Sequence, residues 1–361
     1  KEMNRILHFC LLFIFLFLIG VSGKIDVTRK TKSLNVHRMD TFRGLTINDT
    51  NMRVTGVGTG GIFAILYSFS QAKNVKEVGA FSGAAVWGCH EMDGLSGCHH
   101  QVSLSTAQVT SFIYQHMDTG RFMNGTIHDH LRQQSIVLLS HLKSKVVRPS
   151  AVSQAADMYH LLNVHKLVHI DLPDANIGLS VNHDQGVDCS LRQSPFLLNC
   201  HFDALSLFDH LPSLPLSRYF FSSPSSFHAS INNLTFKSSS TSFGQYFEIP
   251  YSGPSPSLAK FHYAYVPDRC QHVICHLHIH FHPCKVQSQH ILRDYFHDYI
   301  EKLHLSSSHI HFFPQIQASY KPTNVRACFD YYGYSSPNYL SSVPGSQLYD
   351  IHEFLLHLLH D

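Results

Sequence analysis

The sequence predicts an α/β fold built on a mainly parallel sheet. Two segments carry this prediction, 52–72 and 136–162, because in each an apolar strand pattern leads into a helix-periodic stretch. Strands that alternate with helices favour a parallel sheet, since each helix returns the chain to the start of the next strand. Apolar residues make up 44% of the 361 residues, which is enough for a substantial core and excludes a disordered chain.

The first of these segments has a strand pattern at Met52–Thr55, a glycine-rich turn at Gly56–Gly61 and a helical pattern at Ile62–Ala72. The second has a buried-strand pattern at Ile136–Leu139 and a helical pattern at Ala151–Leu162. A turn rich in glycine between a strand and a helix can carry a nucleophile or a phosphate. No phosphate-binding motif fits this spacing, so we expect the hydrolase type of turn.

The remaining elements are shorter. We expect strands at Leu167–Ile170, Ala264–Val266 and Leu277–Phe281, and a final helix at Gln347–Leu359. Between them, residues 190–259 are rich in Ser, Pro, Asn and Phe and show little periodicity. This composition predicts a loop-rich insertion or connector within one domain that spans residues 24–361.

Residues 1–23 have the parts of a secretory signal peptide. Lys1 and Arg5 precede an apolar run at Phe9–Ile19, and small residues follow it. The run is short for a membrane span, although an uncleaved anchor is the alternative. We therefore expect a secreted protein with no membrane span after cleavage.

The cysteine count agrees with export. Of nine cysteines, Cys10 lies in the apolar run, and an even number remain: Cys89, Cys98, Cys189, Cys200, Cys270, Cys275, Cys284 and Cys328. Eight cysteines in an oxidising compartment predict four disulfides, for which 105 pairings exist. Three sequons, at Asn48, Asn124 and Asn233, are compatible with N-glycosylation.

The charge balance argues against nucleic acid as a partner, because 27 Lys and Arg stand against 25 Asp and Glu. Histidine is abundant, with 30 residues, and His276, His278, His280 and His282 alternate along one strand pattern. A strand would place all four on one face, where they are weak candidates for a metal site. Alternate side chains are about 7 Å apart, so we favour packed histidines and expect neither a metal nor a cofactor.

Five segments then occur in the order typical of one known family. The strings "TGLSSGG", "FAGG", "SPFINDCGYDAA", "YVYVP…C…CRLHIALHGC" and "GCWDWWGY" resemble, in turn, Thr55–Gly61, Phe81–Ala84, Ser194–Ala204, Tyr263–Cys284 and Ala327–Tyr334. Through these segments the chain resembles the secreted poly(3-hydroxybutyrate) depolymerases. The resemblance implies a circularly permuted α/β-hydrolase fold.

The resemblance fails at the catalytic triad. The family's nucleophilic serine falls on Gly58, its aspartate, in a segment like "SGTKDSVV", falls on Ser144, and its histidine, in a segment like "GHAxPT", falls on Leu179. None of these side chains can attack an ester, hold an imidazolium or shuttle a proton. His183 is the alternative base, but no displaced nucleophile accompanies it in the sequence.

Other parts of the family site are retained. The resemblance places oxyanion-hole-like backbone N–H groups at Thr59 and Cys284, and it replaces the family's tryptophans with Phe329, Tyr331 and Tyr332. We expect these three aromatic residues to line a groove beside Gly58. The resemblance and the short separations favour the disulfides Cys89–Cys98, Cys189–Cys200, Cys270–Cys275 and Cys284–Cys328.

These observations predict an inactive relative of the esterases that binds an ester- or polymer-like ligand in a groove. One alternative is an active carboxylic ester hydrolase that uses a displaced constellation. The other is a secreted metal-binding protein based on the histidine strand.

Overall fold

The computed structural model describes residues 36–85, 105–118, 127–182, 186–194, 196–214, 218–221, 244–253, 255–286, 295, 308–321, 323–336, 339 and 344–360. Residues 35–361 belong to one compact unit. The signal-peptide prediction for residues 1–23 lies outside the described residues. Within the described part, no helix is long and apolar enough to cross a membrane.

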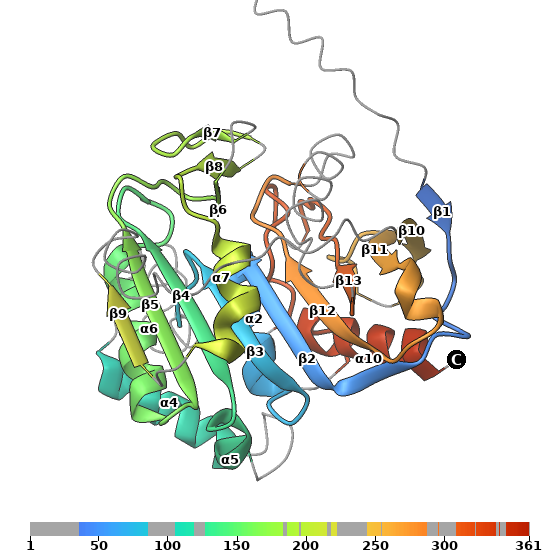
Figure 1. The fold of residues 1–361 in the computed structure, drawn as a ribbon, viewed down its shortest axis with the longest axis horizontal. Helices are drawn as coiled ribbons and strands as arrows, with labels where there is room; N and C mark the ends of the chain where they lie inside the picture. The colour runs from blue at the N-terminus through green and yellow to red at the C-terminus, as the bar shows by residue number, and fades with distance from the viewer. Residues whose placement is uncertain are drawn as a thin grey trace, which may run out of the picture. The chain divides into compact units, whose positions relative to one another are not determined.

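The unit is organised around a ten-stranded sheet that is parallel except at the two pairings made by β11 (Figure 1). Along the sheet the strands are β1 (Val36–Arg38), β10 (Gly244–Pro250), β11 (Phe261–Pro267), β13 (His309–Phe313), β12 (Cys275–Phe281), β2 (Ile47–Val57), β3 (Val75–Phe81), β4 (Ser135–His141), β5 (Lys166–Leu172) and β9 (Arg218–Phe221).

The first strand, β1, lies at one edge of the sheet, and the second, β2, lies near its centre. From β2 the chain builds outward through β3, β4 and β5, and it later fills the other half with β10 to β13. This mostly parallel sheet with flanking helices is α/β-hydrolase-like, as predicted. A separate three-stranded sheet consists of β6 (Leu179–Val181), β8 (Leu197–Asn199) and β7 (Val187–Asp188).

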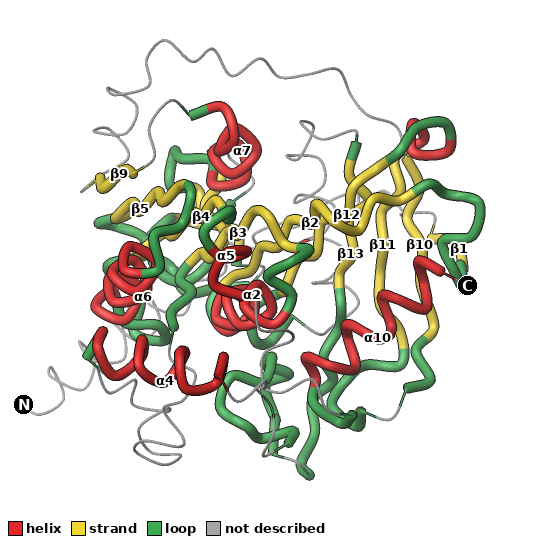
Figure 2. The backbone as a smooth tube through the Cα atoms, turned by 90° about the horizontal axis from the view of Figure 1, so that it is seen from below, coloured by secondary structure: helices red, strands yellow, loops and turns green. Residues whose placement is uncertain are grey.

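Helices cover both faces of the large sheet (Figure 2). One face carries α2 (Thr59–Ser70), α4 (Thr106–Asp118), α6 (Pro149–Leu161) and α10 (Gln347–His360), and the other carries α7 (Ala204–His210). A short helix, α5 (Ile127–Leu131), precedes β4, and 3-10 turns occupy Leu211–Ser213 and Asp268–Gln271. The buried apolar residues accordingly form two clusters.

An ion-pair network fixes α7 to the sheet. Arg53 on β2 donates to Glu77 on β3 and to Asp209 on α7, the latter at 2.6 Å, and its guanidinium lies 5.0 Å from the ring centre of Phe208. Burial raises the pKa of Asp209 to about 6, with Arg53 opposing the shift. Removing Arg53 would leave the buried carboxylate of Asp209 without its cation.

The strands and helices expected from the sequence are all present. Most extend beyond the expected bounds, whereas α2 and α6 begin earlier and end one or two residues before the expected ends. The composition of residues 190–259 concealed regular structure, because β8, α7, β9 and β10 fall within the described part of that stretch. Asp203 caps α7 by accepting hydrogen bonds from the N–H groups of Leu205 and Ser206.

Candidate functional site

The strand β2 leads into α2 through a sharp turn at Gly58. This residue has φ 60° and ψ −120°, a conformation that glycine adopts without the cost a Cβ would bring. A Cβ on Gly56 would overlap the carbonyl of Gly60, and one on Gly60 would overlap the carbonyl of Phe281. These glycines therefore allow the turn to pack tightly against the end of β12.

The space above Gly58 is filled by an apolar side chain. A Cβ built on Gly58 would lie 2.7 Å from Cδ1 of Ile177, which is buried. Gly58, at the position where the family motif has a serine, thus carries no nucleophile. The side chain of Ile177 covers it.

The residues at the positions expected for the family's aspartate and histidine also lack acid–base chemistry. Ser144 is buried after β4, and its Oγ accepts hydrogen bonds from the N–H groups of Val146 and Val147 at 3.3 Å. Leu179 begins β6 and is fully buried among apolar residues. Both segments still reach the turn, because Val146 and Ile177 line the same pocket.

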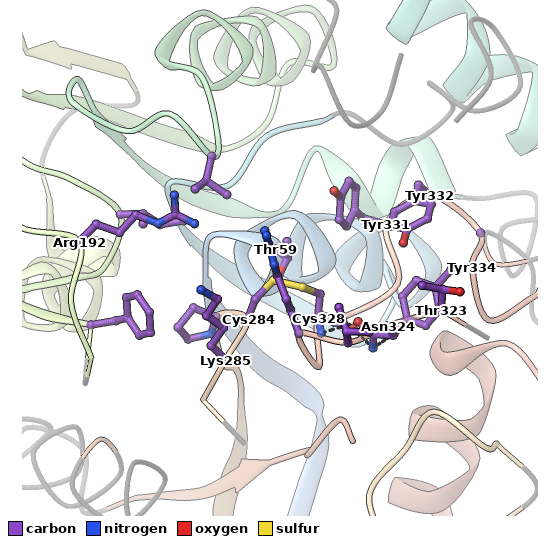
Figure 3. A pocket seen from close by; sticks show the side chains of 17 residues that line it. Thr59, Arg192, Cys284, Lys285, Thr323, Asn324, Cys328, Tyr331, Tyr332 and Tyr334 are labelled. Atoms are coloured by element: carbon purple, nitrogen blue, oxygen red, sulfur yellow. Dashed lines mark hydrogen bonds between the residues drawn. A yellow bond between two sulfur atoms is a disulfide. The ribbon is translucent and has the colours of Figure 1, made fainter. Parts of the chain in front are cut away.

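A pocket of about 800 Å³ opens beside the turn (Figure 3). Thr59 and Cys284, the two oxyanion-hole-like positions, meet at its centre, where Thr59 Oγ1 lies 3.0 Å from Cys284 Sγ. The disulfide between Cys284 and Cys328 joins the loop after β12 to the aromatic segment 329–334.

Two of the three predicted groove aromatics lie in this pocket. Tyr331 and Tyr332 are half-buried and line it, with ring centres 4.8 Å apart. The prediction for Phe329 was wrong. Phe329 is fully buried and packs against Phe63 and Phe281 with ring centres 5.0 and 5.1 Å away, so it belongs to the core.

Asp330 explains why neighbouring aromatics diverge. Its Oδ1 accepts hydrogen bonds from the N–H groups of Tyr332, Gly333 and Tyr334, and its Oδ2 accepts one from Ser335. Burial raises the pKa of this carboxyl, and the hydrogen bonds oppose the shift. The carboxyl folds the chain into a tight loop after Phe329, which turns the tyrosines towards the pocket.

A serine–histidine contact that the sequence analysis missed lies near the turn. Ser82 Oγ is hydrogen-bonded to Nδ1 of His141, whose Nε2 lies 3.4 Å from Ser180 Oγ. All three residues are buried, and burial lowers the pKa of His141 to about 3, so its imidazole is neutral. The sequence did carry a signal for this contact. In the family strings quoted above, the positions of Ser82, His141 and Ser180 are Ala, Gly and Ala, so all three polar residues depart from the family pattern.

The alternating histidines contact protein groups. His278 and His280 both bond the Thr55 hydroxyl, at 2.9 and 2.8 Å, and His280 also bonds Tyr295 at 2.9 Å. Within the described residues no three His, Cys, Asp or Glu side chains form a group that could hold a metal ion. His276 is half-buried beside His309, with ring centres 5.5 Å apart.

The prediction that all four histidines share one face was wrong for His282. Its ring packs 4.9 Å from that of Phe329 in one apolar cluster, whereas His280 packs against Tyr295 and Phe313 in the other. The physical reason is that β12 ends at Phe281, so the two-residue alternation no longer applies to His282.

Three of the four predicted disulfides are in the structure: Cys189–Cys200, Cys270–Cys275 and Cys284–Cys328. The fourth pair, Cys89–Cys98, lies outside the described residues, as do His183, Asn124 and Asn233. Asn48 is half-buried on β2, and its Oδ1 accepts a hydrogen bond from the Thr50 N–H at 2.9 Å.

Comparisons with known proteins agree with the motifs. No family model matches the chain. A curated relative, the poly(3-hydroxybutyrate) depolymerase of Delftia acidovorans, is 24% identical over 328 residues, which are 87% of this chain and 60% of that protein. The chain is therefore similar in sequence to a poly(3-hydroxybutyrate) depolymerase. It spans 60% of the length of the curated depolymerase that it matches.

Two solved depolymerase structures share the fold. The crystal structure of PHB depolymerase from Penicillium funiculosum superimposes with a TM-score of 0.71 and 17% identity, over 89% of this chain and 98% of that one. A PHB depolymerase variant complexed with an R3HB trimer gives the same values. The predicted fold is confirmed by these matches.

Proposed function

We propose that this protein binds an ester- or polyester-like ligand in the pocket beside Gly58 without cleaving it. The observation that carries the proposal is the turn itself. Gly58 occupies the nucleophile position, and the apolar side chain of Ile177 occupies the space in which a serine hydroxyl would lie. The tyrosine-lined pocket and the pair Thr59 and Cys284 remain, and these parts can hold an acyl chain.

The absence of a triad predicts no turnover. Loss of one triad member typically lowers the rate by several powers of ten, and here no position supplies its role. We expect hydrolysis of p-nitrophenyl butyrate and of polyhydroxybutyrate at the level of a buffer control. Gly58→Ser should not restore activity, because no base would accept the serine proton. A relative with an intact triad is the positive control.

Calorimetric titration with a soluble 3-hydroxybutyrate oligomer tests the binding half of the proposal. We expect saturable binding that Tyr331→Ala and Tyr332→Ala weaken, because the two rings form one wall of the pocket. The matched control is Tyr320→Ala, which removes a tyrosine that is 85% exposed and does not line the pocket. Binding that is unchanged in both pocket variants would contradict the proposed site.

A second candidate is an ester hydrolase that uses Ser82 as nucleophile and His141 as base. The hydrogen bond between these side chains, the neutral imidazole and the positive φ of 54° at Ser82 favour it. Burial of both residues opposes it, since a nucleophile must reach its substrate. Labelling with a fluorophosphonate, followed by peptide mapping, separates the candidates: a label on Ser82 that Ser82→Ala abolishes would support hydrolysis.

We also infer that the protein folds in an oxidising compartment and is secreted. The three disulfides support this inference, because such bonds form and persist in secreted proteins. Expression in a secreting host should yield the chain in the medium, with its mature N-terminus near residue 24.

A further inference from the structure

The pocket beside Gly58 is unusually basic for this chain. Three cationic side chains line it, Arg192, Lys285 and Arg326, and no carboxylate appears among the described residues of its lining. The whole chain has 27 Lys and Arg against 25 Asp and Glu, so this imbalance is local. A cluster of one sign in a concave site attracts ligands of the opposite charge.

The backbone holds two of these cations together. The N–H of Lys285 donates to the carbonyl of Arg326 at 2.8 Å, and the disulfide between Cys284 and Cys328 links the same two loops. Burial raises the pKa of Tyr331, and the nearby positive charge of Arg326 partly opposes this shift. The two charges and the tyrosine wall are therefore fixed next to one another.

None of the three cations pairs with a carboxylate in the part of the chain that the structure describes. Arg192 lies across the pocket from the tyrosines, with Thr59 and Cys284 between them (Figure 3). Behind Thr59, the first turn of α2 contains no acidic residue, and its cap, Gly58, makes no side-chain hydrogen bond. Among the described residues, no protein anion thus neutralises this side of the pocket.

Much of the remaining lining is apolar, although Thr59, Thr323 and Asn324 also contribute. Val146, Ile177, Phe196 and Val325 contribute hydrocarbon surface beside the tyrosine rings. A small inorganic anion would leave this surface in water, and a neutral polyester segment would leave the cations without a partner. A ligand with one carboxylate and a short acyl body fits both the cations and the apolar surface. Its carboxylate can form bidentate hydrogen bonds with arginine, and its acyl body can cover the hydrocarbon lining.

We propose that the pocket recognises the free carboxylate end of a short hydroxyacid oligomer, rather than the uncharged interior of a polyester. This inference rests on the proposed binding function and names the ligand class for the same site. The cations would hold the terminal carboxylate, and the tyrosines and aliphatic side chains would cover the acyl units next to it.

Calorimetry with two ligands of equal length tests the charge preference: the trimer of 3-hydroxybutyrate as free acid and the same trimer as its methyl ester. At low salt we expect the acid to bind at least tenfold more tightly, and the ratio to shrink as salt screens the exposed cations. Equal affinities for acid and ester would overturn the inference. Inorganic phosphate that competes as well as the trimer would also overturn it.

Variants assign the effect to the pocket. Lys285→Gln with Arg326→Gln should weaken binding of the acid about tenfold and leave the ester unchanged. The control Lys260→Gln removes an exposed cation outside the pocket and should change neither affinity. A preference for the acid that survives in the double variant would contradict the proposed cations.

Chromatography of the same samples separates this inference from the proposed function. Cleavage of the trimer would contradict binding without hydrolysis, while the acid-to-ester ratio would still decide the charge preference. Intact ligands that bind with equal affinity would contradict the charge preference alone, and no binding of either ligand would contradict both.

Discussion

At the residue scale, Gly58 and Ile177 form a matched pair. The positive φ of Gly58 disfavours any side chain, and Ile177 lies where a Cβ would project. A site that only lost its serine would keep the space for it, so the position of Ile177 argues that the surrounding loop has closed over the turn.

This arrangement predicts that Gly58→Ser lowers the free energy of unfolding by more than the backbone strain alone would. The strain should cost about 1–2 kcal/mol, and crowding against Ile177 should add about 1–3 kcal/mol. Gly44→Ser is the control, because Gly44 has φ 89° and no atom lies within 4 Å of its added Cβ. Denaturant unfolding should show the larger loss of stability for Gly58→Ser than for Gly44→Ser. When each substitution is made in an Ile177→Ala background, the two losses should become equal. Equal losses with Ile177 in place would contradict the contact.

At the element scale, the strands β11, β12 and β13, together with His282 just after β12, bury an array of histidines. Burial lowers the pKa of His262 and His311 to about 3 and that of His282 to about 4, and it lowers the pKa values of His278 and His280 well below the usual value. The unfolded chain, with histidine pKa values of about 6.5, therefore binds more protons than the folded protein below that pH.

The folded state should consequently lose stability as the pH falls below about 6.5, by up to about 1.4 kcal/mol per pH unit for each buried histidine. Burial raises the pKa of Asp209 to about 6 and also raises the pKa values of Asp330 and Asp350, and these carboxyls have the opposite effect, but the five histidines outnumber them. Urea unfolding at several pH values between 5 and 8 should show a steep fall. His311→Gln should reduce the slope and exposed His165→Gln should not. A flat profile would contradict buried neutral histidines.

The elements also show what the sequence could predict. The strand at Ile136–Leu139 and the helix at Ala151–Leu162 were found because their apolar periodicity is strong. The helix α7 was missed because serine, proline and phenylalanine surround it, and its position depends on the distant partner Arg53. The motifs located Gly58, but no local pattern indicates that Ile177 covers it. Departures from the family strings mark Ser82 and His141, but they do not indicate that the two side chains meet, since that contact joins separate segments.

At the scale of the whole molecule, the disulfides join segments of very different separation. Cys284–Cys328 connects residues 44 apart and joins the two loops that carry Lys285, Arg326 and the pocket tyrosines, whereas Cys270–Cys275 closes a turn of residues 5 apart. In the chain-entropy view, a longer closed loop restricts the unfolded chain more strongly.

Removing the longer cross-link should therefore cost more. Loop closure gives about 4 kcal/mol for Cys284–Cys328 and about 2 kcal/mol for Cys270–Cys275. Paired Cys→Ala variants, compared by denaturant unfolding, should show this order. Only the Cys284→Ala/Cys328→Ala variant should also lose ligand affinity, because Lys285, Arg326 and Tyr331 are held in place next to that bond. A greater loss of stability from removing Cys270–Cys275 would contradict the loop-closure argument. Ligand binding that survives in the Cys284→Ala/Cys328→Ala variant would mean that the pocket is organised by the sheet alone.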